Sequence, residues 1–91
     1  MAIAIYFPLE NVTKAQYDEI DSGLTDAGAA APKGRTYHCS FGGDDSVQVF
    51  DVWDSQEDFD AFGETLMPLI EKAGVTMPQP VIAEVHNVIT G

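Results

Sequence analysis

Hydrophobic positions repeat every second residue in four segments of the chain, a spacing that is typical of β-strands. In "MAIAIYF" the residues Ile3, Ile5 and Phe7 fall on one face, and smaller residues and Tyr6 fall on the other. The same alternation predicts three further strands, in "RTYHCSF", "SVQVFDVW" and "QPVIAEVHNVI". The second and third of these segments flank "GGDD", which predicts a hairpin with a tight turn.

Between the first two strands the apolar spacing changes to that of a helix. Thr13, followed three residues later by Gln16, has the form of a capping box, and Gly28 is a typical helix stop. The residues predicted to form the buried stripe are Tyr17, Ile20, Leu24 and Ala27. The following "GAAAPKG" combines small residues with Pro32 and Gly34, which predicts a mobile loop.

A second helix is predicted after the hairpin. Ser55 is its expected N-cap, with Asp58 three residues on, and acidic residues suit the positive end of a helix. Its buried stripe is predicted to be Phe59, Phe62, Leu66, Leu69 or Ile70, and Ala73. Pro68 is expected to kink or restart this helix, because proline removes a backbone donor.

The predicted order is β-α-β-β-α-β over one domain, residues 1–91. This order is a split pair of β-α-β units, which folds as a four-stranded antiparallel sheet with both helices on one face, the ferredoxin-like α+β fold. The strands, however, are apolar on both faces: Val49 and Trp53 oppose Phe50 and Val52 in the third strand. Because water would then meet a large apolar patch, we expect a homodimer that packs sheet to sheet into an α/β barrel.

Charge limits the classes of partner. Fifteen Asp and Glu against four Lys and Arg give a net charge of −11, with the acids scattered along the chain. Such a field repels phosphate backbones and anionic lipid headgroups, so we expect no nucleic-acid partner and no membrane association. With one cysteine, Cys39, no long apolar run and no basic leader, the sequence is typical of a soluble cytoplasmic protein.

One charged residue interrupts the apolar alternation of the third strand. If Asp44 and Asp45 form a two-residue turn, His38 lies directly opposite Asp51, with the two Cβ atoms about 4.5–5.5 Å apart. A carboxylate hydrogen-bonded to imidazole fixes the tautomer of the ring and makes it a better base. The pair is therefore a candidate catalytic site, and the alternative is a structural pair of two buried polar groups.

A metal site is a further alternative. Glu84 and His86 alternate on one face of the last predicted strand, and with His38 and Asp51 they make two histidines and two carboxylates. Their spacing is unspecific, so we expect no bound metal. Nucleophile elbows, phosphate-binding loops and dinucleotide fingerprints are also absent.

The junction between the third strand and the second helix resembles a known superfamily. Val52, Trp53, Asp54, Ser55, Glu57 or Asp58, and Phe59 resemble the "VW-D/E-S-x-E-x-F" segment of dimeric α/β-barrel proteins, and above all of antibiotic-biosynthesis-monooxygenase-like domains. The resemblance implies the ferredoxin-like fold. It covers several functions, among them cofactor-independent oxygenases, haem-degrading enzymes, isomerases and proteins of no known activity.

The haem-degrading branch fits this chain poorly. The resemblance puts the pocket aromatic at Phe62, and the haem-ligating histidine of that branch at Lys72. We therefore expect no haem, and without a phosphate-cradling glycine loop no flavin. The oxygenases of the family bind substrate with Trp and Asn side chains; Trp53 is the single Trp here, while Asn11 and Asn87 do not align with that pattern.

Two hypotheses of different classes follow. The first is a cofactor-independent monooxygenase, or a related enzyme, that acts on a small aromatic or polyketide-like molecule. His38 would be its acid/base, oriented by Asp51, with a pocket shaped by Tyr6, Trp53, Phe62 and His86. The second is a non-catalytic dimeric module for ligand binding or assembly, in which Trp53 is a packing residue.

Overall fold

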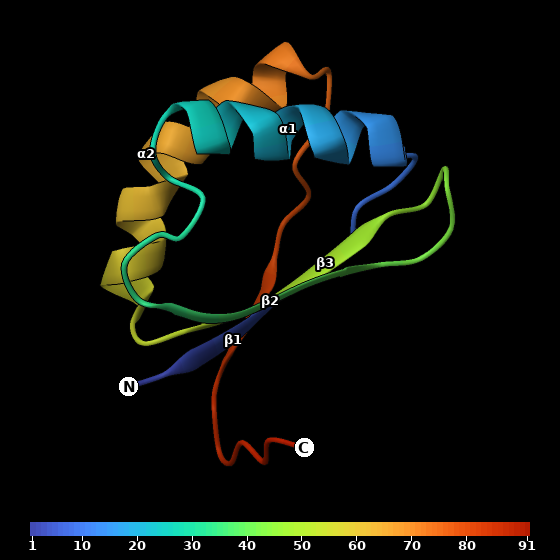
Figure 1. Ribbon diagram of the computed structural model, residues 1–91. Coiled ribbons are helices and arrows are strands. Elements are labelled where there is room, and N and C mark those ends of the chain that lie inside the picture. Colours follow the sequence, from blue (N-terminus) through green and yellow to red (C-terminus); the bar gives the residue numbers. More distant parts are fainter.

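Six elements follow one another in the order that the sequence predicts. The protein, described here over residues 1–91 by a computed structural model, has the elements β1 (Ile3–Phe7), α1 (Lys14–Asp26), β2 (Arg35–Phe41), β3 (Gln48–Trp53), α2 (Gln56–Lys72) and β4 (Val81–Glu84). The strands form one antiparallel sheet in the order β2-β3-β1-β4. Both helices lie on the same face of this sheet (Figure 1). The fold is ferredoxin-like.

The register of the β2-β3 hairpin is the predicted one over most of its length. His38 pairs with Asp51, and Phe41 pairs with Gln48 close to the turn. Near the start of β2 the register shifts: Tyr37 pairs with Val52, but Arg35 pairs with Trp53. One extra residue, Thr36, therefore lies in β2 as a bulge, and the strand loses its regular alternation there.

Local sequence signals account for both helix starts. The Thr13 hydroxyl accepts from the Gln16 backbone N–H while the Gln16 side chain accepts from the Thr13 N–H, which completes the capping box. The Ser55 hydroxyl accepts from the Asp58 N–H. Helix α2 continues through Pro68 as one element, so of the two effects expected there, a kink or a restart, the restart does not occur. Neither helix has the length and apolar run that a membrane crossing requires.

The core lies between the sheet and the helices. Ile3, Ile5 and Phe7 of β1 are buried, as the alternation predicts, and Trp53 and Ile5 are completely inaccessible to solvent. The rings of Phe59 and Phe62 from α2 pack on the Trp53 indole, with centroids 5.5 and 5.3 Å away. Asp51 is the single buried polar residue, with 4% of its surface exposed. A carboxylate in that position requires hydrogen-bond partners.

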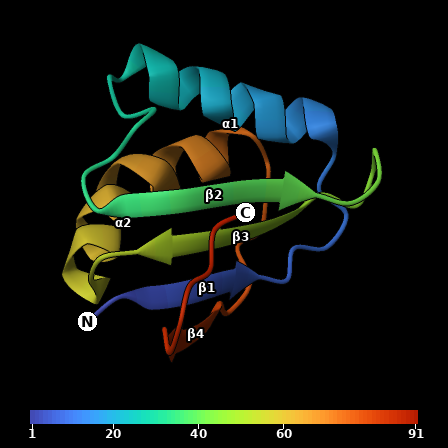
Figure 2. The ribbon, with the colours of Figure 1, turned by 60° about the horizontal axis from the view of Figure 1, so that its bottom comes forward.

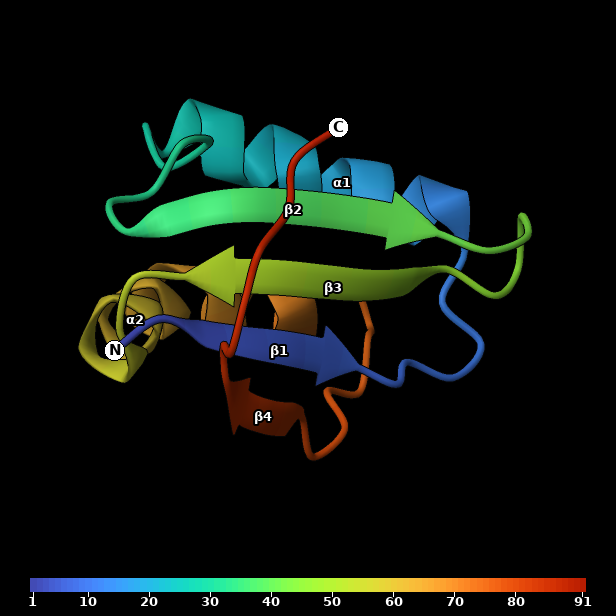
Figure 3. The ribbon, with the colours of Figure 1, turned by 90° about the horizontal axis from the view of Figure 1, so that it is seen from below.

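The opposite face of the sheet has no covering layer (Figure 2). It carries exposed aromatic rings: Tyr6, Tyr37 and Phe41 are 37, 55 and 46% exposed. The last strand is shorter than the sequence predicts, because it ends at Glu84 rather than near Ile89. Beyond Glu84 the chain leaves the edge of the sheet and crosses this open face (Figure 3).

Candidate functional site

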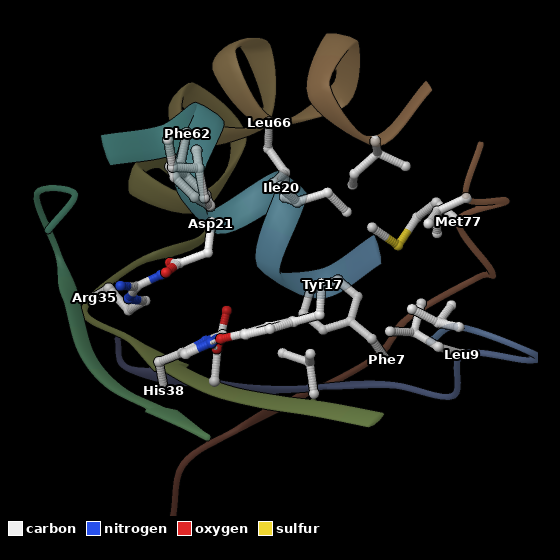
Figure 4. Close-up of a pocket in the computed structure, with 16 residues that line it drawn as sticks. Phe7, Leu9, Tyr17, Ile20, Asp21, Arg35, His38, Phe62, Leu66 and Met77 are labelled. Carbon is white, nitrogen blue, oxygen red and sulfur yellow. Dashed lines mark hydrogen bonds and ion pairs between the residues drawn. The ribbon is translucent and has the colours of Figure 1, made fainter. Parts of the chain in front are cut away.

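A cavity of about 80 Å³ lies between the sheet and the helices. Sixteen residues line it; twelve are hydrophobic and the other four are Asp21, Arg35, His38 and Asp51. Figure 4 shows the labelled polar residues Arg35, Asp21 and His38 on one side and Leu9 and Met77 on the other. A water molecule needs only about 10–15 Å³ of such space. The cavity can therefore hold several waters or part of a small organic molecule.

The buried Asp51 carboxylate is satisfied by two neighbours. Its Oδ1 lies 2.5 Å from Nδ1 of His38 on the adjacent strand. Its Oδ2 accepts a hydrogen bond from Nε1 of Trp53 at 3.2 Å. The first contact follows directly from the register, because directly opposed residues of an antiparallel pair point to the same face. The predicted pairing of His38 with Asp51, and the contact between their side chains, are thus confirmed.

The other ring nitrogen of His38 contacts a helix. Its Nε2 lies 2.7 Å from the hydroxyl oxygen of Tyr17 on α1. An ionised Asp51 can only accept, so in the neutral imidazole Nδ1 carries the proton and Nε2 accepts from the Tyr17 hydroxyl. A chain of hydrogen bonds therefore runs from Tyr17 through His38 and Asp51 to Trp53. It places Nε2 of His38 at the wall of a cavity whose lining is mostly apolar.

The electrostatics of the site keep Tyr17 protonated. Its pKa is raised from the ordinary value of 10.0, first by burial and then by the nearby carboxylates of Asp21 and Asp51. The charge of Arg35 and the nearby Ser40 side chain act in the opposite direction but are outweighed. At neutral pH the hydroxyl of Tyr17 is therefore protonated and can donate its hydrogen bond to Nε2 of His38.

The four remaining aromatic or histidine residues predicted for the pocket are only partly brought together. Phe62 lines the cavity, whereas Trp53 lies behind Asp51 in the core and acts as a hydrogen-bond donor. Tyr6 does not reach the cavity, because alternation puts it on the open face, where its hydroxyl donates to Gln48 at 3.1 Å. His86 does not reach it either: it follows the end of β4 and is exposed.

The alternative of a metal site is not supported by the topology. Glu84 is the last residue of β4 at one edge of the sheet, and His38 belongs to β2 at the other edge; His86 lies beyond β4, outside the sheet. Strands β3 and β1 separate Glu84 from His38, and no three His, Cys, Asp or Glu side chains form a cluster that could hold a metal ion. Lys72, at the position that the resemblance gives to a haem ligand, is the exposed last residue of α2.

Three residues of the site were not predicted from the sequence. The sequence pattern predicts for Tyr17 only a place in the apolar stripe of its helix, although its position in the first turn directs its hydroxyl to β2. Asp21 lies one turn further along the same helix, where the sequence does not distinguish it from the other acidic residues of α1. Arg35 reaches the cavity face only because of the bulge at Thr36. The residue types around Thr36 do not predict a bulge.

Comparison with known proteins gives the fold. No protein-family model and no curated protein matches the sequence. Among solved structures, a candidate antibiotic biosynthesis monooxygenase from Chloroflexus aurantiacus is similar over 99% of this chain and 98% of its own, with a TM-score of 0.70 and 15% identity. SnoaB, a cofactor-independent oxygenase from Streptomyces nogalater, is similar over 99% of this chain and 96% of its own, with a TM-score of 0.63 and 14% identity.

A third similar structure, a candidate antibiotic biosynthesis monooxygenase from Caulobacter crescentus, covers 97% of this chain and 91% of its own, with a TM-score of 0.61 and 20% identity. All three likenesses extend over nearly the whole of both chains. The chain is therefore a ferredoxin-like domain with the fold of antibiotic-biosynthesis-monooxygenase-like proteins, as the Trp53 junction predicts.

Proposed function

We propose that the protein is an enzyme that removes a proton from the hydroxyl group of a small aromatic or polyketide-like substrate, and that it uses no cofactor. The observation that carries this proposal is the hydrogen-bonded chain from Tyr17 through His38 to Asp51 at the wall of an apolar cavity. A general base must lie within hydrogen-bond reach of the proton that it removes. Nε2 of His38 meets this requirement for a substrate hydroxyl that either displaces the Tyr17 hydroxyl or binds beside it.

The proton would move along the chain already present. A substrate hydroxyl bound beside Tyr17 can donate to Nε2 of His38 directly, or to the Tyr17 oxygen while that group donates to Nε2. His38 then becomes an imidazolium held by the Asp51 carboxylate. The remaining phenolate or enolate is electron-rich and can react with O₂ itself. In a monooxygenation of a CH₂ group to a carbonyl, one oxygen atom enters the product and the other leaves as water.

The likeness to SnoaB, named as a cofactor-independent oxygenase, supports the class of reaction but not the substrate. Cavity size bears on the substrate. An engineered protein cavity of about 150 Å³ holds benzene, and the cavity here is about 80 Å³. A single ring therefore fits if side chains move or if part of the ligand projects past His38, whose side chain is 27% exposed.

A second candidate function, a non-catalytic ligand-binding or assembly module, is favoured by a different observation. Every buried side-chain nitrogen and oxygen in the protein already has a hydrogen-bond partner. Tyr17, His38, Asp51 and Trp53 thus form a complete network without any ligand. Complete networks of this kind also serve purely structural purposes.

We also propose that two copies pack through the open sheet face. Tyr6, Tyr37 and Phe41 expose aromatic surface there, and isologous contact of two such faces would bury it. The apolar residues Val88 and Ile89, 59 and 85% exposed, cross the same face without pairing with their own sheet. A second copy would supply the missing contacts.

The catalytic proposal is tested by oxygen uptake with a panel of hydroxylated one-ring and fused-ring aromatics. We expect wild-type turnover with some of them and its loss in His38→Gln. The matched control is His86→Gln, which removes the exposed histidine outside the cavity. Equal loss in both variants, or no loss in either, would contradict the proposal. Saturable binding of these compounds without turnover would instead support the non-catalytic function.

A further inference from the structure

The backbone bulge in β2 brings a cation to the cavity. Residues three apart in a regular strand point to opposite faces, so Arg35 and His38 would not share one. Because of the extra residue Thr36, Arg35 pairs with Trp53 and His38 pairs with Asp51, and both partners point toward the helices. Bulges near active sites commonly redirect a side chain in this way. Arg35 thus lines the same cavity as the candidate base.

Arg35 is the one cationic side chain of the cavity, in a chain with only four Lys and Arg and a net charge of −11. Its guanidinium lies over the Phe62 ring, 5.8 Å from the centroid, and Nη2 donates to the carbonyl of Ala30 at 2.9 Å. No carboxylate oxygen lies within 4.0 Å of it. Arginine has five N–H donors in a planar fork, so most of them remain for a ligand.

From this placement we infer that Arg35 selects ligands that carry an anionic oxygen, a carboxylate or an oxyanion, in addition to the hydroxyl bound at Tyr17 and His38. The inference rests on the proposed function and adds the ligand class. With the bulge removed from the count, Arg35 and His38 are alternate positions of β2, so their Cα atoms are about 6–7 Å apart along the strand and their side chains are neighbours on one face. A ligand with a hydroxyl and a carboxylate on one aromatic ring can then present the hydroxyl to His38 and the carboxylate to Arg35.

Asp21 opposes the attraction between Arg35 and an anionic ligand. Its side chain points toward Arg35 at the polar end of the cavity (Figure 4). Its carboxylate partly balances the guanidinium in the free protein and repels an anionic ligand. Neutralising Asp21 should therefore strengthen anion binding, whereas neutralising Arg35 should weaken it. Opposite effects from two neighbouring residues distinguish an electrostatic role from general damage to the cavity.

The test compares 4-hydroxybenzoate with 4-hydroxybenzamide, which has nearly the same shape but no charge, by NMR titration of the full chain. We expect wild type to bind the anion about tenfold more tightly, since charge-assisted hydrogen bonds to arginine are the stronger kind. Arg35→Gln should lower the affinity for the anion to that for the amide. Asp21→Asn should raise it. Lys33→Gln is the matched control, because it removes the same charge from an exposed residue outside the cavity.

Equal wild-type affinities for the two compounds would overturn the role of Arg35 while leaving the proposed function intact. So would equal weakening by Arg35→Gln and Lys33→Gln. Binding of neither compound would count against both the proposed function and this inference. If Arg35→Gln does not fold, the comparison of the two ligands on wild type and on Asp21→Asn still decides the matter.

Discussion

His38 and Asp51 lie directly opposite each other on β2 and β3, with Nδ1 of the imidazole 2.5 Å from Oδ1 of the carboxylate. The carboxylate is the single buried polar residue of the protein. Because it is held from its other side by the Trp53 indole, it cannot turn away from the ring. The ring is therefore fixed with its second nitrogen toward the cavity, where Tyr17 contacts it.

The first prediction concerns the tautomer. In Asp51→Asn the amide oxygen must face Trp53, because indole can only donate, and the amide NH₂ must then donate to Nδ1 of His38. The proton of the imidazole moves to Nε2, which no longer accepts. We expect turnover to fall by about 10²–10⁴-fold, the usual contribution of a general base, while thermal unfolding changes little.

The control for this variant is Asp54→Asn, which makes the same chemical change at an exposed residue just after β3. It should leave turnover within about twofold of wild type, since exposed charges interact weakly. Full activity of Asp51→Asn, measured by oxygen uptake on a substrate of the wild type, would show that the tautomer of His38 is irrelevant to the reaction.

The second prediction concerns stability. Trp53→Phe retains a ring in the core but removes the donor to Oδ2 of Asp51. A buried acceptor left without a partner costs about 1–3 kcal/mol, and the smaller ring adds a packing loss. Urea unfolding should show this decrease. In the double variant Trp53→Phe/Asp51→Asn part of the loss should be recovered, because an amide is cheaper to leave unpaired than a charge. Strictly additive losses would contradict the coupling.

Much of the site follows from local sequence rules, and the remainder depends on packing. The short turn at Asp44 and Asp45 sets the pairing of His38 with Asp51, so that contact is predictable from the sequence. The contribution of Tyr17 is not, because it depends on how α1 packs over β2. The contribution of Arg35 depends on the bulge in β2, which the residue types there do not predict.

The same distinction applies to the last strand. The apolar residues from Val81 to Ile89 have strand character, but a strand also needs a partner. Glu84 pairs with Ile3, and the Val85 N–H donates to Ala2, so the next positions lie before the start of β1. Pairing with β1 therefore stops there, and the prediction of a strand to Ile89 is wrong for the single chain.

The third prediction concerns pH. The pKa of Tyr17 is raised in the folded protein above its ordinary value of 10.0. Below pH 10 both states hold the proton and Tyr17 makes no pH-dependent contribution. As pH rises above 10, the unfolded chain loses this proton first, so stability falls until the folded pKa is passed. Tyr17→Phe should remove this part of the alkaline loss, measured by urea unfolding between pH 8 and pH 11. An identical decline in both proteins would contradict the raised pKa.

The fourth prediction concerns the dimer. Sedimentation at micromolar concentration should give about twice the chain mass of 9.8 kDa. Phe41→Glu, on the open face, should yield a folded monomer by charging the proposed interface. Met67→Glu on α2 is the control, because Met67 is similarly exposed at 42% but belongs to the helical layer. A monomeric wild type would contradict the proposed sheet-to-sheet contact.

The imidazole ¹⁵N spectrum of His38, recorded with and without phenol, tests the central claim most directly. It distinguishes protonated from unprotonated ring nitrogens without requiring a known substrate. We predict that the free protein has the proton on Nδ1, toward Asp51, and that phenol shifts Nε2 as its hydroxyl replaces or joins that of Tyr17. His86 should not respond. A proton on Nε2 in the free protein, or an Nε2 signal indifferent to phenol at saturating concentration, would contradict the assignment of His38 as the base of this site.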